Sequence, residues 1–161
     1  SRGLGDVYKR QVKNPRKKFL WSIMFPKHPI NTYLFQSCTL PDIEIDQVAH
    51  GDVNRDVKTA GRVTIGNLVV EKLMTTAGSD TWLHDWLYSC QDHIVGGGLV
   101  PSQYWETAIV NELAEDGVSV LNTHVFEEVW PCKITGLDLD RMASENTIES
   151  IEFSVGTADK Y

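Results

Sequence analysis

Residues 104–130 read YWETAIVNELAEDGVSVLNTHVFEEVW and carry the clearest pattern in the chain. The runs 104–114 and 118–130 are rich in β-branched and aromatic residues, which favours strands. Residues 115–117 between them read Glu-Asp-Gly, and an Asp-Gly pair supplies the positive φ angles of a tight hairpin. The stretch therefore predicts two antiparallel strands, and Pro131 after the second predicts a strand end, an edge or a bulge.

Further strand patterns lie on both sides of this hairpin. Residues 19–25, 32–39 and 63–75 are short and rich in β-forming residues, with a break indicated by Gly-Asn at 66–67. Residues 147–155 alternate polar residues with Ile151, Phe153 and Val155, as in a strand with one face on a core.

The period changes to that of a helix between these strands. Apolar positions spaced as on one helical face are Trp82, Leu83, Trp86, Leu87 and Cys90. Ser79 or Asp80 is expected to cap this helix, and residues 93–102, with three successive glycines, are expected to form a flexible loop. The predicted fold is mainly β (α+β): an antiparallel sandwich or barrel with one flanking amphipathic helix.

Large aromatic side chains are the candidates for the core because each buries a large apolar area. The residues expected to pack there are Trp21, Trp82, Trp86, Trp130 and Phe153.

Residues 44–62 are polar and mixed in charge, with Gly51 and Gly61 and no apolar period. We interpret them as a long irregular loop, and such loops are often functional. Because the segment carries both signs of charge, it suits complementary contacts with an identical neighbour. The interface residues expected are Glu44, Asp46, Asn54, Arg55, Asp56, Lys58 and Arg62.

Composition limits the possible functions. The length of 161 residues, 42% of them hydrophobic, predicts one domain over residues 12–161. With 22 acidic against 15 basic residues, the net charge of −7 argues against tight nucleic-acid binding. No apolar run reaches the ~18 residues that cross a bilayer, which predicts no membrane anchor. The three cysteines are too far apart for a disulfide framework and are expected to be reduced.

The first residues are expected to lie outside the fold. Residues 6–11, Asp-Val-Tyr-Lys-Arg-Gln, resemble the translation of a transposase adapter used in sequencing libraries. An ordinary disordered leader is the alternative, and in both cases residues 1–11 are predicted to be inert.

The sequence carries no convincing catalytic or metal-binding constellation. The best cluster, Cys90, Asp92 and His93 with His84 on the preceding helix, lacks the spacing of a zinc motif. Glycines 96–98 lack the Lys-Ser/Thr of a phosphate-binding loop. We therefore predict no metal, no cofactor and no enzymatic activity, with a small metal-dependent enzyme as a remote alternative.

The order of motifs resembles the tail tube proteins of T4-like contractile-tailed bacteriophages, from about residue 19 to the end. The segments that carry the resemblance are FQSCTLP at 35–41, NRDVKTAG at 54–61, Asp85-Trp86, YWETAIV at 104–110, Trp130-Pro131 and the last strand after Glu145-Asn146. The short segment that such proteins usually carry ahead of the first strand is expected to be replaced here by the adapter-like residues, so its contacts with a neighbouring subunit are not predicted.

The resemblance implies a structural subunit that forms hexameric rings, which stack into a hollow tube conducting DNA from the virion. It implies a late protein that assembles in the host cytoplasm, resides in the virion tail, and has sheath, baseplate and tape measure proteins as partners. Other rings of this fold remain alternatives, namely a type VI secretion tube, a baseplate subunit or a tail terminator. A monomeric carbohydrate- or peptide-binding sandwich is a further alternative.

The channel of such a tube is expected to be neutral to negative, because Lys or Arg facing DNA would bind its phosphates. The candidate lumen residues are Glu71, Glu127, Glu128, Glu149 and Glu152.

Overall fold

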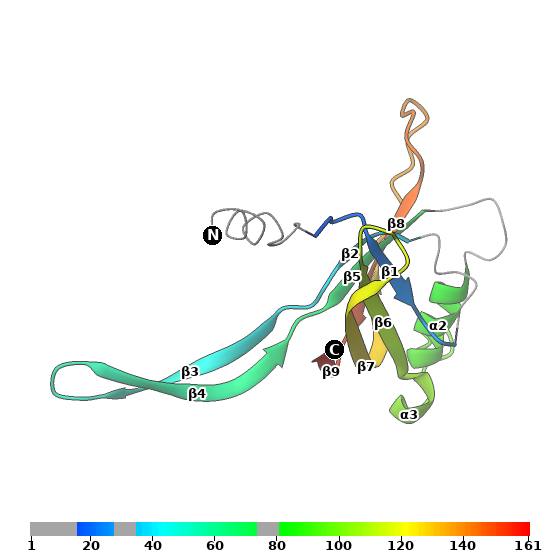
Figure 1. Cartoon of the computed structure of the whole chain (residues 1–161). Helices are drawn as coiled ribbons and strands as arrows, with labels where there is room; N and C mark the ends of the chain where they lie inside the picture. Colours follow the sequence, from blue (N-terminus) through cyan, green and yellow to red (C-terminus); the bar gives the residue numbers. More distant parts are fainter. Residues whose placement is uncertain (1–15, 28–34, 74–80) are drawn as a thin grey trace, which may run out of the picture.

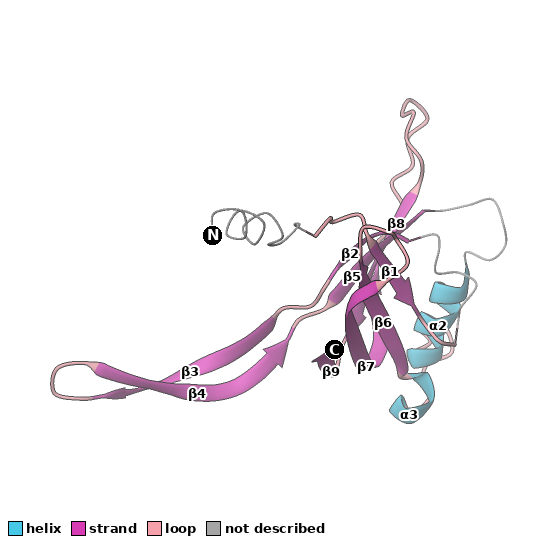
Figure 2. Ribbon diagram, in the orientation of Figure 1, coloured by secondary structure: helices cyan, strands magenta, loops and turns pink. Residues whose placement is uncertain are grey.

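The computed structural model describes residues 16–27, 35–73 and 81–161. Strands dominate the described residues, with short helices at one side (Figures 1 and 2). The elements are β1 (Trp21–Met24), β2 (Phe35–Thr39), β3 (Ile43–Gly51), β4 (Asp56–Ile65), β5 (Leu68–Leu73), α2 (Trp82–Cys90), α3 (Pro101–Tyr104), β6 (Glu106–Leu113), β7 (Val120–Ile134), β8 (Ile148–Ser154) and β9 (Thr157–Lys160). This is the mainly β, antiparallel fold with a flanking helix that the sequence predicts.

Seven strands form one antiparallel sheet around the long strand β7. The order is β1-β6-β7-β8-β5-β2, and β9 pairs with β7 beside β8. The sheet has two halves, β1-β6-β7 and β7-β8-β5-β2, and β7 belongs to both. Its first part pairs with β6, and its last part, Trp130 to Ile134, pairs with β8. β1 and β2 are at opposite ends of this order but line one groove, so the sheet curls into an open barrel.

A bulge in β7 marks the place where the strand passes from one half to the other. Glu127 and Glu128 together lie opposite the single residue Thr107, between the pairs Glu106–Val129 and Ala108–Phe126. Glu128 has φ of 56°, an unusual angle for a residue with a side chain, and its carboxylate lies over Gly156. A Cβ at position 156 would overlap Glu128, so a glycine there accommodates the bulge.

The core lies between the two halves and is closed at one end by α2. Across the strands, Leu68 is opposite Phe153 and Val70 is opposite Ile151, and all four side chains are buried. Phe25 packs its ring 5.2 Å from that of Phe153. This inward face is the one that the alternation in residues 147–155 predicts.

The helix α2 packs through its tryptophans, as the spacing predicts. The centroids of the Trp82 and Trp86 rings lie 5.9 Å and 5.8 Å from that of Phe25. Trp86 is buried, and its Nε1 donates a hydrogen bond of 2.8 Å to the carbonyl of Tyr104. Ser79 and Asp80, the expected capping residues, lie outside the described residues; Thr81 takes the N-cap position without a side-chain cap.

Trp130 does not take the core position expected of it. It is opposite Ser154 on the outer face of the sheet and contacts the ring of Tyr104, with centroids 5.9 Å apart. The buried position next to it is occupied by Pro131. Of the three outcomes predicted from Pro131, the structure shows the bulge, because β7 continues to Ile134 after a register shift. Trp21 is half-buried against the core.

The largest difference from the sequence prediction concerns residues 44–62. They are an antiparallel hairpin, β3 and β4, and not an irregular loop. The hairpin forms a separate two-stranded sheet that extends far from the barrel (Figures 1 and 2). Among the described residues, no helix is long and apolar enough to cross a membrane. The predicted inert segment 1–11 lies outside the described residues.

Candidate functional site

The hairpin of residues 43–65, which we call the arm, continues the hairpin of β2 and β5 outward from the barrel (Figure 1). At its base the amide of Gly66 donates a hydrogen bond of 2.8 Å to the carbonyl of Asp42. At its tip the amide of Asp52 bonds the carbonyl of Arg55 at 2.9 Å, and the Asp52 carboxylate accepts from the amide of Val53 at 2.7 Å. The arm is therefore closed at both ends by local hydrogen bonds.

Apolar side chains occupy one face of the arm near the barrel. Ile43 is opposite Ile65 and Ile45 is opposite Val63, so these four side chains share a face. Ile43, Ile45 and Val63 are 61%, 53% and 59% exposed. A two-stranded ribbon is marginally stable in water by itself, and contiguous exposed apolar side chains mark interaction sites.

A bulge at Gly61 changes the face to which the side chains of β4 point. The register shifts between Ile45 and Gln47, after which Val57 of β4 lies on the face opposite to that of Val63, whereas β3 alternates without interruption. A Cβ at Gly61 would come within 3.0 Å of the Asp46 carbonyl, so the strands approach closely at the bulge. This change of face hides the period of two in the sequence.

All seven predicted interface residues lie on the arm, and all are exposed. The Asp, Glu, Lys and Arg residues of β3 are all acidic, namely Glu44 and Asp46. The turn and β4 carry both signs. Their residues are Asn54 and Arg55 in the turn and Asp56, Lys58 and Arg62 on β4.

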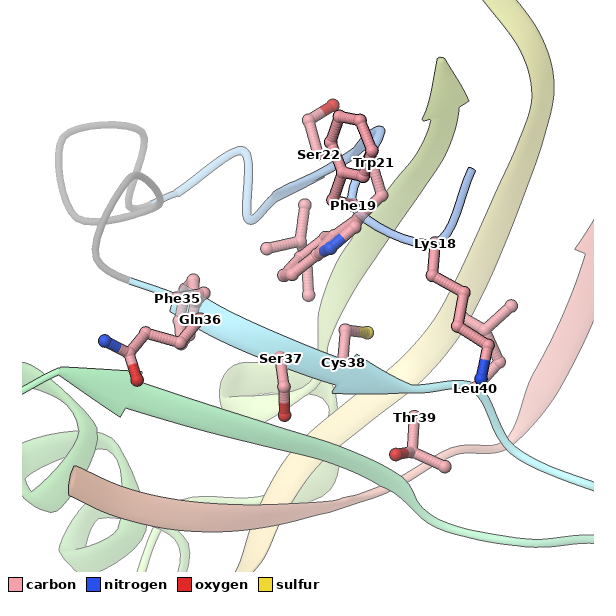
Figure 3. Close-up of a pocket in the computed structure, with 11 residues that line it drawn as sticks. Lys18, Phe19, Trp21, Ser22, Phe35, Gln36, Ser37, Cys38, Thr39 and Leu40 are labelled. Carbon is pink, nitrogen blue, oxygen red and sulfur yellow. The ribbon is translucent and has the colours of Figure 1, made fainter. Parts of the chain in front are cut away.

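A groove of about 1030 Å³ opens between β1 and β2 on the barrel (Figure 3). Residues of the β1 segment, such as Phe19 and Trp21, line one side, and β2 with Leu40 after it lines the other. Among the described residues of the lining Lys18 is the one charged residue, and Phe19 is 75% exposed at the rim. Cys38 also lines the groove, and burial raises the pKa of its thiol to about 12, which keeps it protonated and unreactive at neutral pH. No motif in the sequence indicates this groove.

Four of the five candidate lumen residues retain access to solvent. Glu71 is exposed on β5, Glu127 and Glu128 are exposed at the bulge of β7, and Glu152 is half-buried on β8 beside Lys133, with the charged atoms 4.0 Å apart. Glu71 and Glu152 point away from the core, because their neighbours in each strand are the buried ones.

Glu149 has the opposite orientation and cannot line a channel. It is 2% exposed and lies on the core face of β8 with Ile151 and Phe153. Across the ladder it is opposite the buried Lys72, and its carboxylate lies 4.0 Å from Nδ1 of His84. The alternation that directs Ile151 inward directs Glu149 inward as well.

The candidate metal residues serve local structure. The Cys90 thiol donates to the carbonyl of Trp86 at 3.3 Å, and burial raises its pKa. Asp92 accepts from the amides of Ile94 and Val95 at 2.8 Å and 3.4 Å. Within the described residues, no three His, Cys, Asp or Glu side chains gather to hold a metal ion.

These features define a class: a curled antiparallel β-barrel with one flanking helix and a long projecting hairpin. Solved structures of this class share the fold at low sequence identity. The PVC sheath/tube terminator of an extracellular contractile injection system gives a TM-score of 0.77 at 18% identity, covering 93% of this chain and 99% of the other. The PVC sheath-tube complex gives 0.75 at 18% identity over 96% of both chains, and the tube-terminating cap of the anti-feeding prophage gives 0.76 at 15% identity over 93% of both.

A match between this sequence and a family of known proteins identifies the family. The profile of the T4-like virus tail tube protein gp19 matches residues 17–157, and the chain belongs to that family. Its members are structural tube proteins of the virion tail and not enzymes. The comparison with curated proteins gives no match. The match to the tail tube family confirms the resemblance that the sequence motifs indicate.

Proposed function

We propose that this chain is the repeating subunit of a phage tail tube, in which six copies form a ring and rings stack into a hollow conduit. The arm is the observation that carries this proposal. It exposes apolar side chains on a ribbon that is marginal alone, so its stable environment is the surface of another molecule.

Stacking in a tube needs two different patches of one surface, because such head-to-tail contacts repeat without closing. The arm supplies one patch and carries charges of both signs near its tip, Arg55 and Asp56 among them. Charged contacts of this kind set the register and the choice of partner more than the affinity. We therefore assign the arm to contacts between stacked rings.

The uncovered face of β5 and β8 is the proposed lining of the channel. Glu71 and Glu152 lie on this face with Lys133, so two carboxylates accompany one ammonium group. A slightly acidic wall repels the phosphates of passing DNA and offers few places where the duplex would bind.

Assembly partners are proposed by analogy. The solved structures with this fold include a sheath-tube complex and a baseplate, which supports sheath and baseplate proteins as partners of this chain. Assembly in the host cytoplasm is proposed from the resemblance to phage tail tubes alone. A tape measure protein and DNA would occupy the channel in turn.

Electron microscopy of the Arg55→Glu variant tests the stacking role of the arm. The variant should remain folded, with an unchanged Tm, and should form rings but short tubes or none. Glu115→Lys, a charge reversal in the exposed β6–β7 turn, is the matched control and should form tubes like the wild type. Tubes of normal length from Arg55→Glu would contradict the assignment.

A terminator ring is the second candidate, because the terminator of the PVC system matches this fold as well as its tube does, with TM-scores of 0.77 and 0.75. The same micrographs separate the two functions. A tube subunit polymerises by itself, whereas a terminator stays as a single ring.

A further inference from the structure

The groove between β1 and β2 is bounded by two strand edges. In the part of the chain that the structure describes, β1 pairs with β6 alone and β2 pairs with β5 alone. Each strand therefore presents one row of backbone N–H and C=O groups toward the groove side. Such edges are templates for pairing with a further strand unless they are covered.

The lining of the groove is partly apolar and partly polar, so it suits a strand whose side chains alternate between the two kinds. Phe19 and Trp21 stand on the β1 side and Leu40 stands at the end of the β2 side (Figure 3). The one charge among the described residues of the lining, Lys18, adjoins Lys17 in the sequence, whereas Arg16 before them is paired with Glu112 at 2.6 Å. A segment that fits this groove is extended and carries apolar side chains next to acidic ones.

β3 of the arm has these properties. It is nine residues long and, among the described strands, pairs with β4 alone, which leaves its outer edge open to another strand. Ile43 and Ile45 are exposed on one face, while Glu44 and Asp46 project from the other. β4 carries Lys58 and Arg62 and is the poorer match for a groove whose charge is positive.

The arm of one molecule points away from its own barrel (Figure 1). β3 therefore reaches such a groove on a second copy and not on its own chain. We propose that the groove between β1 and β2 receives β3 of a neighbouring copy, which adds a strand to the open barrel and places Glu44 and Asp46 near Lys18. This contact is strand addition, in which main-chain hydrogen bonds give affinity and the side chains give register. This proposal rests on the proposed tube function and adds the place where the arm docks.

Two variants and their mixture test the contact. The arm variant Ile43→Glu/Ile45→Glu removes the apolar face of β3, and the groove variant Phe19→Glu/Ser22→Glu places acidic groups in the groove. All four residues are exposed, so both proteins should fold. Each variant alone should form rings without tubes, because one half of the contact is lost in every copy.

The mixture of the two preassembled variants is decisive. The intact arm of the groove variant enters the intact groove of the arm variant, whereas the reverse contact brings acidic groups together. The mixture should therefore give stacks of two rings that grow no further. Met142→Glu, at a position 92% exposed outside both surfaces, is the matched control and should form full tubes.

The outcomes separate this proposal from the tube function. Full-length tubes from the groove variant, with none from the arm variant, would place the arm elsewhere and overturn the docking site alone. Full-length tubes from the arm variant would overturn the docking site and the stacking role of the arm, and would leave the tube function standing. A mixture without paired rings, from two folded variants, would also overturn the docking site. Gln36→Glu, on the exposed side of β2, replaces the groove variant if that protein has a lowered Tm.

Discussion

At the scale of the residue, the β6–β7 turn depends on the carboxylate of Asp116. It accepts from the Ser119 hydroxyl at 2.6 Å and from the amides of Val118 and Ser119 at 2.9 Å. These bonds lower the pKa of Asp116 from 3.8 to about 2. A carboxyl whose pKa is lower in the folded state stabilises the fold above its unfolded pKa, and the effect disappears as the pH falls through about 2.

Asp116→Ala should therefore lower the Tm at pH 7, and the difference from the wild type should shrink as the pH falls from about 4 to about 2. Thermal unfolding at a series of pH values measures this. Glu115→Ala, next to it in the turn, is the control. A difference that stays constant across the series would assign the effect to turn geometry and not to the charge.

Gly98 is a second position where a single residue matters. A Cβ there would lie 2.2 Å from the carbonyl oxygen of Cys90, which is backbone and cannot rotate away. Around it, the amide of Leu99 bonds the carbonyl of Ser89 at 2.9 Å, and Asp92 bonds the backbone of Gly96 and Gly97. The glycine segment expected to be a flexible loop is thus held by specific hydrogen bonds.

Gly98→Ala should lower the free energy of unfolding by about 1–3 kcal/mol, because the added methyl must displace backbone. Gly136→Ala meets no atom within 4 Å and should change that free energy by less than ~0.5 kcal/mol. Denaturant unfolding of both variants gives the comparison. Equal losses of unfolding free energy at the two sites would show that the backbone around Gly98 shifts to accommodate the added methyl group.

At the scale of the element, turn residues and the alternation of apolar residues predict those strands that pack against the core. The hairpin of β6 and β7 follows from its Asp-Gly turn and from strands that alternate against a core. Most of the arm has no core to face, and the apolar residues of β4 change sides at the Gly61 bulge, so the same reasoning misses its strands. Trp130 is misplaced because the prediction used its size alone, whereas the bulge at Glu128 reverses the alternation along β7 and turns Trp130 outward.

The arm should also be dispensable for folding. Replacing residues 43–65 by Asn-Gly keeps the base, where Gly66 already bonds Asp42 at 2.8 Å. The shortened chain should unfold at the Tm of the wild type within a few degrees, since the buried residues of the core lie outside the arm and Ile65 is the one arm residue that packs against them. It should form no tubes. Scanning fluorimetry and microscopy measure the two properties, and a collapse of the Tm would show that the arm stabilises the barrel.

At the scale of the whole molecule, the groove is the feature that sequence reasoning cannot reach. It exists because β1 and β2, distant in strand order, come together when the sheet curls. That approach depends on the register of all the strands between them, and no short window of sequence specifies it. The charged residues of the arm were predictable because exposure and charge are local properties, even though the strand structure was not.

The channel proposal gives the last prediction at this scale. Reversing both charges on the proposed lining, as Glu71→Lys/Glu152→Lys, should leave tubes intact, because both side chains point away from the core. The lining would then carry three lysines, with Lys133, and each lysine that meets a phosphate releases a counterion. Short duplex DNA should bind inside the variant tubes at low salt, become protected from nuclease, and be released as salt rises. Tubes of the wild type and of Glu115→Lys, which places its charge in the exposed β6–β7 turn, should protect none. If the variant tubes protect no more DNA than the control, another face lines the channel.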